Sequence, residues 1–67
     1  MSELFLTKEL YTDAYIDRAC RDYKGITDIT IIDEGSYYRL IFQDCIYPED
    51  ITMCEFENYL IDLMAKK

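Results

Sequence analysis

The stretch ITDITIIDEGSYYRLIF, residues Ile26–Phe42, decides the fold because it has the pattern of two strands joined by a tight turn. β-Branched and aromatic residues, which favour strands, fill both halves of the stretch. Between them lies Asp33–Ser36, where Gly35 can adopt the positive φ that tight turns often require. The sequence therefore predicts a β-hairpin.

Side chains alternate between the two faces of a strand, so the hairpin divides its residues into two sets. One face, assigned to the core together with Leu4 and Leu6, is expected to carry Ile29, Ile31, Tyr38, Leu40 and Phe42. The other is expected to carry Asp28, Thr30, Ile32, Tyr37, Arg39 and Ile41. A shift of one residue in the strand register would exchange the two sets, and the sequence leaves that alternative open.

The residues before the hairpin predict a short strand and an amphipathic helix. Leu4–Leu6 is the strand candidate, with Phe5 on the opposite face from the two leucines. Thr12 is expected to cap the helix and Gly25 to stop it. From Asp13 to Lys24, one half of the helix carries the apolar residues Tyr15, Ile16, Ala19, Cys20 and Tyr23.

The C-terminal segment predicts a second amphipathic helix. Pro48–Asp50 has the composition of a turn, and Thr52 followed three residues later by Glu55 is a capping-box pattern. The apolar stripe of this helix is expected to contain Met53, Phe56, Tyr59, Leu60, Leu63 and Met64. Two helices with one apolar stripe each need a common apolar surface, which a three-stranded sheet provides.

The expected fold is therefore a single small α+β domain over residues 1–67, in the order β-α-β-β-α. We expect both helices on one face of the sheet. The last strand is expected in the middle, antiparallel to both others, and the connection through the first helix should be right-handed.

This arrangement leaves the second face of the sheet without a helix. Exposed apolar patches often mark interaction sites, and Tyr and Arg are frequent in binding hot spots. We therefore predict a partner-binding surface at Phe5, Ile32, Tyr37, Arg39 and Ile41. The alternative is that the face has no partner, because small antiparallel sheets often keep a partly apolar face in water.

Charge and composition narrow the classes of partner and the compartment. The 67 residues include 14 acids and 7 bases, a net charge of −7, which opposes nucleic acid or an anionic membrane as a partner. A basic protein surface suits this charge better. No apolar run approaches the roughly 20 residues that cross a bilayer, and no signal peptide is visible. With an odd number of cysteines, 3, we expect a reduced, cytoplasmic protein.

The residue types of most catalytic and metal sites are missing or badly spaced. The chain has no His, the commonest general base and metal ligand. Cys20, Cys45 and Cys54 form no Cys-x-x-Cys pair. All three cysteines are interpreted as structural, with Cys20 in the core; Cys54, near the positive end of the closing helix, is the one candidate for a lowered pKa. We predict no catalytic residue, metal or cofactor, and no enzymatic activity.

Two segments, LFLTKELYTDAYIDRACRDY and EFENYLIDLM, resemble the HxsD-like family, small accessory proteins found with radical-SAM enzymes in peptide-maturation systems. The shared features include Lys8, Leu10, Tyr11, Ala19, Cys20, Tyr23, Phe56, Glu57, Asn58, Leu60 and Asp62. The family usually continues past the closing helix, whereas this sequence ends at Lys67, and a function carried by such an extension is left open. The resemblance implies a non-catalytic helper that binds a precursor peptide, its maturase, or both.

Three modes of interaction stay open at this point. A peptide could add a strand to the sheet, at the Leu4 strand or at the Ile26–Asp33 strand. The strong negative charge alternatively suits a small acidic inhibitor or nucleic-acid mimic that occupies a basic groove, which requires acids crowded on one face. The third mode is homodimerisation through the uncovered sheet face.

Overall fold

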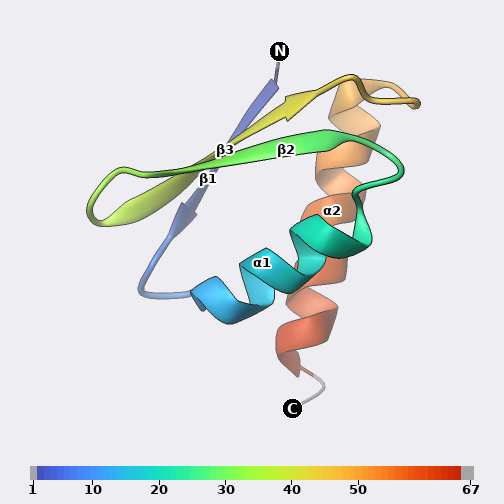
Figure 1. The fold of residues 1–67 in the computed structure, drawn as a ribbon. Coiled ribbons are helices and arrows are strands. Elements are labelled where there is room, and N and C mark those ends of the chain that lie inside the picture. Colours follow the sequence, from blue (N-terminus) through green and yellow to red (C-terminus); the bar gives the residue numbers. More distant parts are fainter. Residues whose placement is uncertain (1, 66–67) are drawn as a thin grey trace.

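In a computed structural model, which describes residues 2–65, the elements follow the predicted β-α-β-β-α order (Figure 1). They are β1 (Ser2–Thr7), α1 (Asp13–Asp22), β2 (Asp28–Asp33), β3 (Tyr37–Gln43) and α2 (Glu49–Ala65). The α+β prediction is confirmed.

The three strands form one sheet in which β3 lies between β1 and β2 and pairs antiparallel with both, as predicted. Leu40 lies opposite Leu4 on one side and opposite Ile31 on the other. Residues directly opposite one another share a face, so the expected division of the strands into two sets is confirmed and the one-residue shift is excluded. Gly35 adopts a φ of 95° in the turn between β2 and β3, as that turn requires.

Both helices lie on the same side of the sheet (Figure 1), where α2 packs against β1 and α1 packs against α2. Two edge-to-face ring contacts centre on Phe56, whose centroid lies 5.4 Å from that of Phe42 and 5.3 Å from that of Tyr23. The buried core consists of Leu6, Ile16, Ala19, Leu40, Phe42, Phe56 and Leu60. Leu4, Ile29 and Tyr38, which lie on the sheet face predicted to form the core, are only partly buried against this cluster.

The predicted start of the closing helix is wrong. The helix begins at Glu49, so Thr52 lies inside its first turn rather than at its cap. The Pro48 carbonyl accepts hydrogen bonds from both the amide and the hydroxyl of Thr52, each at 3.0 Å. Glu49 and Asp50, expected in a turn, instead occupy the first helical turn, where their negative charge favours the helix dipole.

The ends of α1 also differ in detail from the expectation. Thr12 is the N-cap residue, but its side chain makes no capping hydrogen bond. The helix ends at Asp22, before Gly25: the Tyr23 amide donates to the Ala19 carbonyl at 3.1 Å, and the Lys24 amide then makes a tighter turn bond to the Arg21 carbonyl at 3.2 Å. Within residues 2–65, neither helix combines the length and the apolar character needed to cross a membrane.

Candidate interaction surface

The sheet face turned away from the helices carries all five predicted contact residues, which we call the open face: Phe5, Ile32, Tyr37, Arg39 and Ile41. Arg39 lies directly between Phe5 on β1 and Ile32 on β2. Ile41 and Tyr37 lie two residues further along β3, one in each direction, and so share this face. Neither helix covers it (Figure 1).

The aromatic residues of the open face form a pair at one end. The rings of Phe5 and Tyr37 meet edge to face, with centroids 5.6 Å apart. Phe5 is 55% exposed, and the other four residues of the face are half-buried. A partner that binds over the Phe5 ring would remove its exposed apolar area from water, which is favourable.

Arg39 is held between two carboxylates. Its Nη1 lies 3.5 Å from Glu3 Oε2, and its Nε lies 3.0 Å from Glu34 Oε2. Among residues 2–65, Nε is buried without an acceptor at hydrogen-bonding geometry, so the contact with Glu34 is an ion pair rather than a hydrogen bond. The guanidinium is therefore already balanced in the free chain, and a partner's acid would have to compete with Glu3 and Glu34 for it.

A second surface feature, missed by the sequence analysis, lies on the helix side of the sheet. Ile31 faces that side, opposite the buried Leu40, yet it is 38% exposed. Beside it, α1 and β2 enclose a groove of about 460 Å³ lined by Asp13, Ala14, Ile16, Asp17, Ile31 and Tyr38. The alternation of side chains places Ile31 on the correct face, but the prediction that Ile31 belongs to the core is wrong. Alternation along a strand carries no signal for this groove, because it does not specify where α1 lies over the sheet.

The cysteines differ in their surroundings. Cys20 packs against the core, and its burial raises the pKa of the thiol to about 11. Cys45 Sγ lies 3.1 Å from the hydroxyl of the buried Thr27. Cys54 is exposed. Because α2 starts earlier than predicted, Cys54 lies in its second turn, and the expected position at the positive end of the helix is wrong. Within residues 2–65, no three Cys, Asp or Glu side chains are grouped to hold a metal ion.

The 14 acids are spread over both helices, two of the strands and the connecting loops. Several pair with bases: Asp17 Oδ2 lies 3.4 Å from Arg21 Nη2, and Asp33 Oδ1 lies 2.7 Å from Lys8 Nζ. This distribution gives no support to a surface that imitates the phosphates of a nucleic acid.

No protein-family model, curated protein or solved structure matches this chain. The resemblance to the HxsD-like family stays a prediction.

Proposed function

We propose that this chain is a non-catalytic accessory protein that binds a polypeptide partner through its open face. The observation that supports the proposal is that both helices lie on one side of the sheet, which leaves the five residues of the open face together on the other side. The sequence resemblance supplies the setting, a peptide-maturation system in which the partner is a precursor peptide, its radical-SAM maturase, or both.

The chemistry of the open face suits a protein partner. Phe5 and Tyr37 would serve as anchors, because large rings bury much area with few rotatable bonds. Arg39, with Glu3 and Glu34, would form a polar centre that a partner must match. The net charge of −7 would accelerate association with a basic partner and oppose an acidic one.

We also propose a cytoplasmic location for this function. The odd number of cysteines, 3, is unusual for a secreted domain held together by disulfides. Thiols stay reduced in the cytoplasm, which agrees with this proposal.

The test is binding of the full chain to the precursor peptide and to the radical-SAM enzyme encoded beside its gene. A double variant, Phe5→Ser with Ile41→Thr, removes apolar area from the open face and leaves the core untouched. We expect roughly tenfold weaker binding, the usual consequence of truncating a hot spot. The matched control is Ile61→Ser, which removes an isoleucine that is 47% exposed on α2.

Two results would contradict the proposal. One is equal affinity of the wild type and the double variant for both partners. The other is a gene neighbourhood without a radical-SAM enzyme, which would remove the peptide-maturation setting. Homodimerisation through the same face is tested separately, by sedimentation of the wild type and the double variant over a range of concentrations.

A further inference from the structure

The outer edge of β2 is open. The strand pairs with β3 along Asp28–Asp33, and within residues 2–65 no strand pairs with its other edge. Such an edge presents unpaired backbone N–H and C=O groups in a row, which is the template that an extended segment needs to join a sheet.

The groove between α1 and β2 runs beside this edge and has an apolar floor. Ile16, Ile31 and Tyr38 contribute side chains to it, and the 38% exposure of Ile31 lies on this side of the sheet. A second hollow of about 260 Å³ shares Asp17 and Ile31 with the groove and extends toward Ile29. We call the groove and this hollow together the channel. A strand added to β2 would direct every second side chain into the channel.

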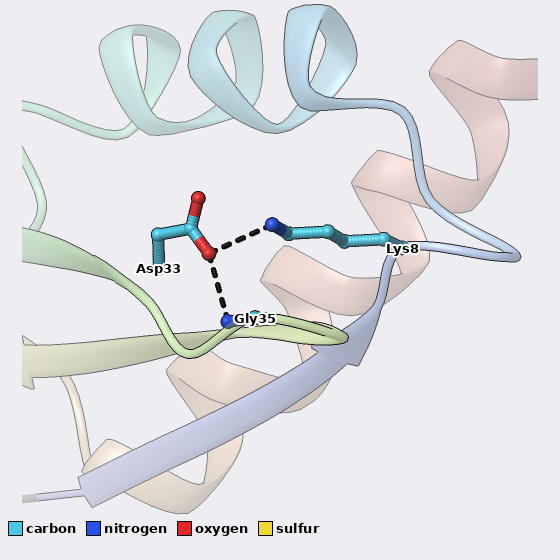
Figure 2. Close-up of polar contacts among 3 residues, drawn as sticks. All are labelled: Lys8, Asp33 and Gly35. Carbon is cyan, nitrogen blue, oxygen red and sulfur yellow. Dashed lines mark hydrogen bonds and ion pairs between the residues drawn. The ribbon is translucent and has the colours of Figure 1, made fainter.

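The charges along the channel are unequal. Asp13 and Asp17, four residues apart on α1, line the groove, and its lining contains no base. Arg21 and Lys24 line the second hollow. Lys8, which lies over the Tyr38 ring at 4.8 Å, is already paired with Asp33 (Figure 2). Asp17 is already paired with Arg21, whose Nη2 lies 3.4 Å from Asp17 Oδ2, so a cationic side chain in the groove would bind beside Asp13 and compete with Arg21 for Asp17.

We infer that the edge of β2 accepts an extended segment of a partner polypeptide as a fourth strand. A lysine or arginine of that segment lies with its apolar stem on Ile31 and its charged head between Asp13 and Asp17. This inference shares with the proposed function only the assumption that the partner is a polypeptide. The two can be tested separately, because the groove and the open face lie on opposite sides of the sheet.

The β1 edge and a second copy of the chain are the alternatives. Beside β1 lies a hollow of about 410 Å³ that is also lined by acids, Glu3, Asp50 and Glu57, and the Ser2 hydroxyl at this edge is hydrogen-bonded to Glu49. Pairing of β2 with a second copy of the chain would bring together two molecules that each carry a net charge of −7, and that repulsion opposes such a pair.

The experiment titrates the isotope-labelled full chain with a blocked peptide, Thr-Val-Thr-Lys-Thr-Val-Thr, and follows backbone amide resonances. We expect saturable shifts confined to β2 and to the facing side of α1. Two comparison peptides are used: one has Glu in place of Lys, and the other is N-methylated at every second residue along one edge. Both should bind at least roughly tenfold more weakly, because one loses the charge-assisted contact and the other loses backbone hydrogen bonds.

Variants of the protein separate the groove from general attraction between opposite charges. Asp13→Asn with Asp17→Asn should weaken binding of the Lys peptide roughly tenfold, whereas Glu55→Gln with Asp62→Asn, on the exposed side of α2, should not. Equal weakening by both pairs, equal binding of the N-methylated peptide, or the absence of saturable shifts in β2 would overturn the inference. None of these results bears on the open face, whose double variant should bind the peptide normally.

Discussion

The ammonium of Lys8 lies 2.7 Å from Oδ1 of Asp33, a residue 25 positions later in the chain (Figure 2). The same carboxylate oxygen accepts a hydrogen bond from the Gly35 amide at 2.9 Å. Lys8 also donates its backbone amide to the Ser36 carbonyl. These bonds join the end of β1 to the β2–β3 turn, so the position of the turn depends on a residue outside the hairpin.

This pair predicts a specific pH dependence. The hydrogen bond to Lys8, with that from Gly35, lowers the pKa of Asp33 below its ordinary 3.8. The stabilisation is therefore complete above that ordinary value and is lost as the pH falls through the lower pKa of the folded chain. Asp33→Asn should be less stable than the wild type at pH 7, and this gap should narrow below about pH 4. Urea unfolding at several pH values measures it.

The alkaline side gives the complementary expectation. The hydrogen bond to Asp33 raises the pKa of Lys8 above 10.5, so its contribution is complete below 10.5 and is lost as the pH rises through the higher folded value. Both side chains are solvated, so the difference in unfolding free energy between the wild type and Asp33→Asn at pH 7 should be small. Asp62→Asn, an exposed acid on α2, is the control. A gap that does not change with pH would contradict this account.

Replacing Phe56 with Ala should remove most of the stability. The ring is fully buried and contacts both Phe42 and Tyr23, and truncations of this kind cost about 3–5 kcal/mol. A domain of 67 residues has roughly 3–10 kcal/mol in total. Urea unfolding followed by circular dichroism measures the loss. Ile61→Ala should change the unfolding free energy by less than about 0.5 kcal/mol, and Phe56→Leu should keep the fold. Equal losses for Phe56→Ala and Ile61→Ala would argue against this core.

Thr27 predicts a measurable contribution from one buried hydroxyl. Its side chain, 3% exposed, donates to the Gln43 carbonyl at 2.8 Å and so joins the approach to β2 to the end of β3. Thr27→Val keeps the shape but removes the donor, and it should cost about 1 kcal/mol. Thr27→Ser keeps the hydroxyl and removes a methyl group. We expect the hydrogen bond to contribute more than the packing of the methyl group, so Thr27→Val should unfold at a lower temperature than Thr27→Ser. The reverse order would refute the prediction.

The cysteines should react at different rates with a thiol reagent at pH 8. With a pKa of about 11, only about a thousandth of Cys20 is thiolate at that pH, and the group is also half-buried. Cys54 is exposed and should react first. Cys54→Ser should abolish the fast phase, whereas Cys20→Ala should leave it unchanged. A fast phase that survives Cys54→Ser would assign it to another thiol.

The register of the hairpin could be predicted because two independent features of the sequence agree on it. These are the turn at Gly35 and the alternation of apolar residues in the strands on both sides of that turn. The start of α2 is predicted wrongly, because Thr52–Glu55 and Pro48–Asp50 both have the composition of a helix start, and the helix begins at the earlier one, at Glu49. The open face follows from alternation alone. The groove beside Ile31 and the contacts of Arg39 with Glu3 and Glu34 depend on how the elements approach one another in space, which local pattern does not specify.

The central position of β3 has a consequence for how the chain folds. The β2–β3 hairpin closes over a few residues, whereas β1 reaches β3 only by joining Thr7 to Tyr37 and Ser2 to Phe42, across 30 to 40 positions. Local contacts form fastest, so we expect the hairpin to appear early and the N-terminal strand to attach late. Until β1 attaches, β3, with Leu40 and Phe42, is an exposed edge strand, and a second nascent chain could pair with it instead. Aggregation during synthesis should therefore depend on how quickly Ser2–Thr7 returns to the sheet.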